Sequence, residues 1–297
     1  MESLMKNPDV TCVVNEADQL GETPLWCERT QKLWWLDIER PRLQSFDPSS
    51  GRHDVFTFDS TYAGSLAICA SGGFLVALDN DLFRFDPDTR ALEKFVTVEP
   101  KNPATRLNDG RCDRQGRFWV GTMDNGLSQP RGSLYRVDPS GVVTRADQGF
   151  IVSNSLTTSP DGRTLYFSDT RKYVMWAFDL DVDSGDISNR RVFFDHSADG
   201  SRPDGACVDA DGCVWNAIFA GSRIVRYSPT GKIDRTIALP VTNPTCLCFG
   251  GADYSTLYVT SATKMIGPEM LAEETLAGAV LALDVGVKGL PEAAFRI

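Results

Sequence analysis

The feature that most constrains the fold of this chain is a short unit that recurs six times. Each copy contains an apolar and aromatic stretch, such as Lys32–Asp37 or Thr164–Asp169, followed by a segment ending near an acidic residue and a glycine. One residue marks the apolar stretch of each copy: Trp34, Leu75, Phe118, Leu165, Val214 and Leu257. Successive markers are 41, 43, 47, 49 and 43 residues apart. This period indicates a repeat architecture, not two unrelated domains.

The composition of the repeats favours β-structure throughout. The stretches are rich in Val, Phe, Tyr and Trp, and turn sequences such as Gly72-Gly73 and Asp161-Gly162 separate them. Six units of this length, each with room for about four strands, predict an all-β, six-bladed β-propeller that forms one domain over residues 1–297. Two stacked sheets are the alternative fold. Only residues 268–276 read as a short helix.

Charge and hydropathy exclude several partners. The chain has 30 Lys and Arg against 40 Asp and Glu, a net charge of −10, which argues against nucleic-acid binding. It has no apolar run of the length that crosses a membrane, and residues 1–10 lack the apolar core of a secretory signal. We therefore expect a cytoplasmic protein without a membrane partner, as a monomer or weak dimer.

Cysteine and histidine usage restricts the chemistry further. The eight cysteines form no C-x-x-C pair, so free buried thiols are expected in preference to disulfides or zinc sites. The two histidines, His53 and His196, are too few for a multi-histidine zinc site. A Ser-His-Asp arrangement would have to use one of them.

Polar residues recur at a matched position of the repeat. Four of them precede the aromatic position of their own copy by 11 or 12 residues: Glu22, Asn108, Asn154 and Asp204. Ser65 and Thr245 fall near the same position in the other two copies, with a less certain alignment. In a propeller the first strand of every blade lines the central channel, so these side chains are expected to form a ring at one mouth.

Such a ring predicts a cation. Two carboxylates brought together and desolvated are costly without a counter-charge, which a divalent metal supplies. Carboxylate and amide oxygens suit Ca²⁺, Mg²⁺ or Mn²⁺. The alternative is that Asn-Asp-Gly at 108–110 and Pro-Asp-Gly at 203–205 are plain turns. Turn chemistry explains either motif alone, but it does not explain their shared register.

At these residues the sequence resembles the senescence marker protein/gluconolactonase family, six-bladed propellers that include regucalcin and sugar-acid lactonases. The resemblance extends from residue 19 to about residue 290. The matching stretches include residues 21–26, 106–110, 121–123, 153–156, 202–205, 248–251, 257–260 and 276–280.

The resemblance implies specific roles. Glu22, Asn154 and Asp204 match the family's protein ligands to a divalent metal, with Ca, Mn, Mg, Zn and Fe all open. Asp204 also matches the proposed general base. Arg106 and Asn108 match positions that contact the substrate. The plainer alternatives are that Arg106 is a surface side chain and that Asn108 caps a turn.

The sequence departs from the family pattern at two places. Where the family usually reads Asn-Gly-Leu, this chain has Asn154-Ser155-Leu156, so Ser155 must tolerate any backbone strain that glycine would relieve. Some relatives carry a substrate-contacting Glu shortly after Gly-Thr-Met. Here Asp124 follows Met123 and is the candidate replacement.

The function that these features predict is hydrolysis of a sugar-acid (aldono) lactone, a small-molecule substrate, to the free acid. The metal would polarise the lactone carbonyl, and Asp204 would accept a proton from the attacking water. Two other functions remain open at this stage. One is another metal-dependent hydrolase, such as an organophosphate or aryl-ester hydrolase, and the other is a non-enzymatic calcium-binding regulatory protein or scaffold.

Overall fold

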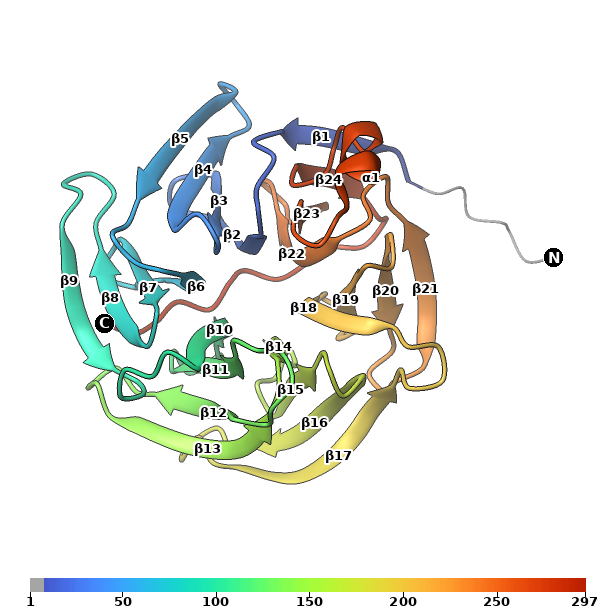
Figure 1. Cartoon of the computed structure of the whole chain (residues 1–297). Coiled ribbons are helices and arrows are strands. Elements are labelled where there is room, and N and C mark those ends of the chain that lie inside the picture. Colours follow the sequence, from blue (N-terminus) through green and yellow to red (C-terminus); the bar gives the residue numbers. More distant parts are fainter. Residues whose placement is uncertain (1–7) are drawn as a thin grey trace.

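The computed structural model describes residues 8–297 and confirms the predicted six-bladed β-propeller. Within these residues six antiparallel sheets of four strands stand around a central axis, as Figure 1 shows. The alternative of two stacked sheets is therefore wrong. All six marker residues lie in the second strand of their blades.

Within each blade the strands are given in order from the channel outwards. The first three blades contain β2 (Gly21–Cys27), β3 (Lys32–Asp37), β4 (Arg42–Asp47) and β5 (Arg52–Thr57); β6 (Ala63–Ile68), β7 (Phe74–Leu78), β8 (Asp81–Phe85) and β9 (Leu92–Thr97); β10 (Thr105–Cys112), β11 (Phe118–Asp124), β12 (Gly132–Val137) and β13 (Val143–Phe150). The next two contain β14 (Ser153–Thr158), β15 (Thr164–Asp169), β16 (Val174–Leu180) and β17 (Ile187–Asp195); β18 (Arg202–Val208), β19 (Val214–Phe219), β20 (Arg223–Tyr227) and β21 (Ile233–Ala238).

The sixth blade joins the two ends of the chain. Its inner strands are β22 (Pro244–Gly250), β23 (Thr256–Ser261) and β24 (Val280–Asp284), and its outermost strand is the N-terminal β1 (Val10–Val14). Strands β1 and β24 pair antiparallel, with Val10 opposite Leu283. This pairing closes the ring, which holds the six innermost strands in fixed positions around the channel.

The core lies between neighbouring blades and is built mainly from the first three strands of each blade. Equivalent tryptophans are buried there and tied to buried acids: the indole Nε1 of Trp119 donates to Asp113 at 2.9 Å and that of Trp215 to Asp209 at 2.8 Å. The four tryptophans expected in the core are all buried: Trp34, Trp35, Trp119 and Trp215. They stabilise blade packing and take no part in the channel mouth.

Every innermost strand has a β-bulge at the same register. The pairing with the second strand shifts between Glu22 and Leu25 in β2, and at the corresponding place in the other five blades. Residues 108–110 and 203–205 lie within β10 and β18 at these bulges. The turn interpretation of those two motifs is therefore wrong, and the shared register reflects a repeated distortion of the inner strand.

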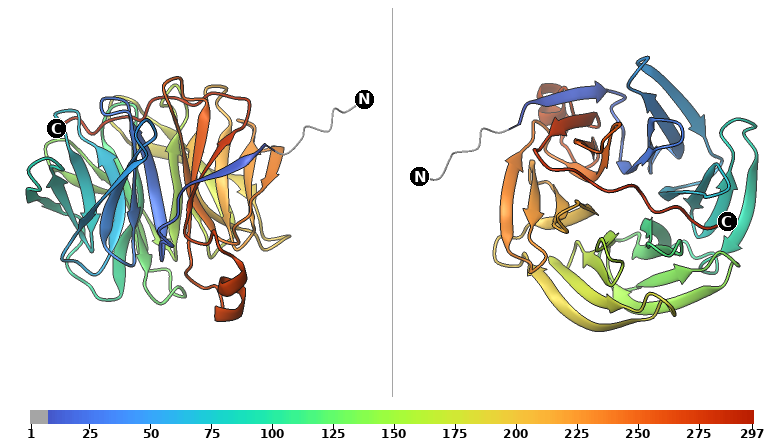
Figure 2. Two further views of the ribbon diagram at one scale, coloured as in Figure 1. Left: turned by 90° about the horizontal axis from the view of Figure 1, so that it is seen from above. Right: turned by 180° about the vertical axis from the view of Figure 1, so that it is seen from behind.

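The C-terminal segment closes one end of the channel. Figure 2 shows it crossing the face opposite the helix α1 (Pro268–Glu273). Phe295 is fully buried and bridges to Cys69, while Glu292 forms an ion pair with Arg111 at 3.2 Å. The helix matches the short helix expected at 268–276 but ends three residues earlier.

The remaining sequence expectations have mixed outcomes. All eight cysteines are free and seven are buried, whereas Cys12 is exposed. His53 is half-buried and lies 3.1 Å from Gln44, and His196 is buried beside Tyr227. Within residues 8–297 no helix is long and apolar enough to span a membrane.

Candidate functional site

A cavity at the channel mouth on the α1 side brings the predicted ring together. Its lining includes all four matched residues, Glu22, Asn108, Asn154 and Asp204, together with Arg106. Each of these five side chains is buried. Ser65 and Thr245, the less certain members of the ring, are also buried but do not line this cavity.

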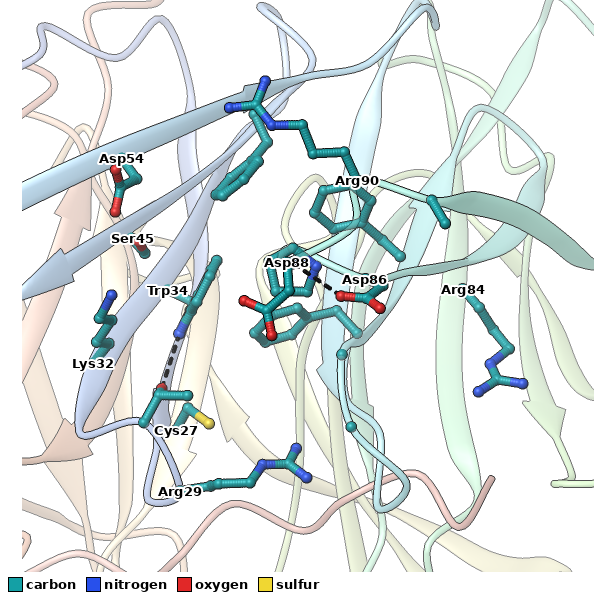
Figure 3. A pocket seen from close by; sticks show the side chains of 18 of the residues that line it. Cys27, Arg29, Lys32, Trp34, Ser45, Asp54, Arg84, Asp86, Asp88 and Arg90 are labelled. Atoms are coloured by element: carbon teal, nitrogen blue, oxygen red, sulfur yellow. Dashed lines mark hydrogen bonds between the residues drawn. The ribbon is translucent and has the colours of Figure 1, made fainter.

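A larger groove lies elsewhere and contains none of these residues. It has a volume of about 980 Å³ and runs between the first two blades, with Lys32, Asp54, Arg84 and Asp86 on its walls, as Figure 3 shows. Its charges are of both signs, and Trp34 also lines it, with its indole Nε1 donating to Thr30 Oγ1 at 3.5 Å. We place the candidate site in the smaller cavity because the buried ionisable groups meet there.

The bulges that position the site hold strained backbone. Thr23 and Ser155, the residues after Glu22 and Asn154, adopt the left-handed conformation with φ of 46° and 58°. A β-branched residue such as Thr23 rarely does so, and such strain is typically found at functional sites. The expectation that Ser155 must tolerate the conformation of a family glycine is confirmed.

The Ser155 side chain also fixes the backbone of the neighbouring blade. Its hydroxyl donates to the carbonyl oxygen of Asp204, and it contacts the Ser168 hydroxyl at 2.7 Å. The Nδ2 of Asn216 donates to both the Ser155 hydroxyl and the Asp204 carbonyl oxygen at 3.0 Å. Serine therefore supplies a link between blades that glycine cannot make.

A chain of hydrogen bonds runs along the floor of the cavity. Arg106 Nη1 donates to Asn108 Oδ1 at 2.6 Å, and Asn108 Nδ2 donates to Asn154 Oδ1 at 3.0 Å. Asn154 Nδ2 in turn donates to Thr170 Oγ1 at 2.7 Å. Arg106 is only 4% exposed and its guanidinium lies 5.0 Å from the centre of the Tyr62 ring. The alternatives of a surface arginine and a turn-capping asparagine are both wrong.

The carboxyl groups in and beneath the cavity are strongly perturbed. Burial, with the nearby charge of Asp109, raises the pKa of Glu22 to about 8. Burial and the charge of Glu22 hold the pKa of Asp204 well above its usual range. Burial also raises the pKa of Asp109 to about 6, although the Leu156 amide donates to it at 2.7 Å. These carboxyl groups repel one another and bind protons unless a cation is present.

The donor set fits a divalent cation that prefers oxygen. One oxygen of Glu22 accepts a hydrogen bond from the Thr23 amide at 2.9 Å, and the other accepts none from the described chain. The side-chain amide oxygen of Asn154, Oδ1, accepts one hydrogen bond and keeps a second lone pair. Residues 8–297 bring together no three His, Cys, Asp or Glu side chains as a metal group. A site here therefore rests on two carboxylates and the Asn154 amide, with Asp204 as the second carboxylate.

Asp124 occupies a different position from the one the sequence suggested. It does not line the cavity, and its carboxylate accepts hydrogen bonds from the amides of Ser128 and Gln129 at 3.1 and 3.0 Å. Arg131 forms an ion pair with it at 2.9 Å, and the two amides lower the pKa of Asp124. In this arrangement Asp124 holds the loop after β11, and its oxygens are already engaged.

Sequence reasoning missed several residues of the site, among them Thr170, Asp109 and Cys246. Thr170 lines the cavity and links Asn154 to the carbonyl oxygen of Pro203, to which it donates at 2.6 Å. Asp109 acts on the charge state of both ring carboxyls, and Cys246 lies close enough to Glu22 for each to shift the pKa of the other. Asp109 lies inside the motif of residues 108–110, but Asn-Asp-Gly is also a typical turn sequence, so the sequence did not single out Asp109 as a site residue. Thr170 carried no signal, because it lies just outside β15.

The fold and the site define a class: a closed six-bladed propeller with a buried carboxylate pair at one channel mouth. The family model for the SMP-30/gluconolactonase/LRE-like region matches residues 20–263. The chain belongs to this family, as the motifs predicted.

The chain is similar to several known proteins along nearly its whole length. It is 37% identical over 290 residues to a 6-deoxy-6-sulfogluconolactonase of Pseudomonas putida, covering 97% of this chain and 99% of that protein. It is 33% identical over 298 residues to regucalcin of Xenopus laevis, covering 98% and 99%. A crystal structure of a calcium-binding protein, regucalcin, from Agrobacterium tumefaciens superposes with a TM-score of 0.93 at 31% identity and covers 98% of both chains.

Replacing Ser155 tests the strained bulge. We expect Ser155→Ala to lower the free energy of unfolding by about 1–3 kcal/mol, because buried hydrogen bonds are lost while the left-handed backbone stays strained. Ser155→Gly should be more stable than Ser155→Ala by about 1 kcal/mol, because glycine relieves that strain. Urea unfolding measures both values.

The matched control is Ser168, the partner of Ser155, which is not in a left-handed conformation. At this position Ser168→Ala should be more stable than Ser168→Gly. A Ser155→Gly protein no more stable than Ser155→Ala would contradict the strain.

The raised pKa of Glu22 predicts how the metal-free protein responds to pH. On folding, this pKa rises from 4.5 to about 8, so the folded protein binds the Glu22 proton more tightly than the unfolded chain does. The contribution of this proton to the free energy of unfolding is complete below pH 4.5 and is lost as the pH rises through 8. Glu22→Gln should therefore gain stability over the wild type as the pH rises from 5 to 8, by up to about 1.4 kcal/mol per pH unit.

Urea unfolding with a chelator present measures this difference. Glu269→Gln, on the exposed helix α1, should follow the wild-type curve. Parallel pH curves for Glu22→Gln and wild type would show that Glu22 is not a buried proton-binding group.

Proposed function

We propose that this protein hydrolyses a lactone of a sugar acid to the free acid at the α1-side cavity. The observation that carries the proposal is the meeting of Glu22, Asp204 and the buried guanidinium of Arg106 in one cavity of a gluconolactonase-family propeller. The similarity to a lactonase across 97% of the chain supports this reaction class.

A divalent metal ion would be held by Glu22, Asn154 and Asp204. When bound, it would supply the positive charge that polarises the lactone carbonyl and keeps both carboxyl groups ionised. The identity of the ion is open, since oxygen donors accept several divalent metals. Calcium is one candidate, because two of the relatives are regucalcins and one of these is described as a calcium-binding protein.

Asp204 is the proposed general base. Ester hydrolysis needs an acceptor for the proton of the attacking water, and a carboxylate must be ionised to accept it. Burial and Glu22 raise the pKa of Asp204, so its ionisation depends on compensating positive charge in the cavity. Activity should therefore fall as the pH decreases, because protons compete for the same oxygens.

Arg106 is the proposed group for the substrate oxygen that becomes negatively charged. Its guanidinium is fixed by Asn108 and by the Leu107 carbonyl oxygen, to which Nη1 donates at 2.9 Å. A buried, pre-positioned cation stabilises developing charge without reorganising at the moment of reaction. Asn108 would hold Arg106 in place and offer its own amide to the substrate. A direct substrate contact by Asp124 would require the loop of residues 125–131 to release its carboxylate.

An ester hydrolase on the same groups is the second candidate. The cavity walls are partly apolar, with Leu20, Ile38, Met123 and Phe219 among the lining residues. Such walls suit an aryl or alkyl ester better than a ring with many hydroxyl groups. The same proton acceptor and metal would serve either substrate.

An assay that detects acid release separates these functions. Wild-type protein should hydrolyse at least one member of a panel of aldonolactones, lose that activity with a chelator and regain it with a divalent metal. Asp204→Asn should lower kcat by roughly 10²- to 10⁴-fold, as expected for the loss of a general base. Circular dichroism should show that the variant is folded.

Asp183→Asn, in an exposed turn between β16 and β17, is the matched control and should retain full activity. Undiminished turnover by Asp204→Asn would contradict its role as base. Turnover of esters alone would select the second candidate, and no turnover of any lactone or ester with any metal would leave a non-enzymatic calcium-binding propeller.

A further inference from the structure

The cavity is rich in positive charge although the protein is acidic. Four cationic side chains line it, Arg106, Arg171, Arg202 and Lys264, against the two carboxyl groups of the proposed metal site. The whole chain carries a net charge of −10. The sign of the charge is therefore reversed where the substrate would bind.

Most of this positive charge is not neutralised within the protein. Lys264 forms an ion pair with Glu39. Within residues 8–297, the three arginines form no salt bridge with a carboxylate; the Nε of Arg171 donates to the Leu127 carbonyl oxygen at 3.1 Å. Arg202 is half-buried and makes no side-chain hydrogen bond to any described residue. These guanidinium groups are available to a ligand.

Arg202 belongs to the same strand as the proposed general base. It stands two residues before Asp204 at the start of β18, and both side chains line the same cavity. Its strand partner Phe219 also lines the cavity, so Arg202 has an apolar neighbour on one side. A partly desolvated guanidinium recognises a planar or tetrahedral oxyanion strongly, through paired hydrogen bonds.

We infer that the substrate carries an anionic substituent, a sulfonate, phosphate or carboxylate group, and that Arg202 with Arg171 binds it. This inference rests on the proposed lactone hydrolysis. A sugar lactone without such a group is neutral and gives these arginines no counter-charge, once a divalent ion has compensated Glu22 and Asp204. Arg106 stays with the reacting carbonyl, because it is held by Asn108 at the floor.

The test compares an anionic with a neutral lactone. The probes are 6-phosphogluconolactone and gluconolactone, which differ only in the phosphate. The wild type should favour the anionic probe in kcat/KM by roughly ten- to a hundredfold, as expected for charge-assisted hydrogen bonds. This preference should shrink as sodium chloride rises from about 20 to about 300 mM, because salt screens the attraction.

Variants assign the preference to the arginine. Arg202→Gln should lower the ratio of kcat/KM for the anionic over the neutral probe by at least about tenfold, and Arg202→Lys should restore part of it. Arg190→Gln is the matched control. Arg190 lies on the outer strand β17, away from the cavity, and forms an ion pair with Asp147 of β13. The ratio of kcat/KM for the two probes should be the same in this variant as in the wild type. Calorimetry with 6-phosphogluconate and gluconate should show the same preference in binding, independent of turnover.

Equal kcat/KM for the two lactones in the wild type, without an effect of salt, would overturn the anionic substrate and leave the lactonase standing. An unchanged ratio in Arg202→Gln would overturn the role of Arg202. Should Arg202→Gln fail to fold, the salt dependence of the wild type and the calorimetry decide the question. Absence of hydrolysis of every lactone would instead refute the proposed function itself.

Discussion

The structure depends on one electrostatic constraint: two carboxyl groups, Glu22 and Asp204, are buried in the same channel mouth. Removing such groups from water is costly, and their mutual repulsion adds to that cost. The ring must therefore be rigid enough to hold them together. The pairing of β1 with β24 closes it, and the C-terminal segment seals the opposite mouth with Phe295 and the ion pair of Glu292 to Arg111.

Much of the fold and part of the site could be predicted from the sequence, because the propeller repeats its local structure. A fixed period places equivalent residues of each blade at equivalent positions, so matched polar residues converge without any knowledge of distant contacts. Glu22 and Asn154 are the last paired residues before the bulge of their strands, whereas Asn108 and Asp204 are the first unpaired residues within it. The bulge of β6 does not bring Ser65 into the cavity. The hydroxyl of Ser65 has no hydrogen-bond partner among the described residues.

Other features depend on contacts that a local pattern does not encode. The carboxylate of Asp124 accepts hydrogen bonds from the loop that follows β11. The sequence does not predict the conformation of this loop, so the chemical similarity of Asp124 to a family glutamate does not show where its carboxylate lies. Thr170 and Arg202 join the site from neighbouring blades. Ser155 was recognised as a strained position, but its link to Asp204 requires the adjacent blade to be in place.

Anomalous X-ray diffraction from crystals soaked with Mn²⁺ tests the central claim most directly. We expect one strong peak in the cavity, with oxygens of Glu22, Asn154 and Asp204 at about 2.0–2.6 Å from the ion. Its loss in crystals of Glu22→Gln would assign the ligands. A cavity without an anomalous peak in wild-type crystals, at saturating Mn²⁺ and pH above 8, would contradict the claim that the buried carboxyl pair exists to bind a metal.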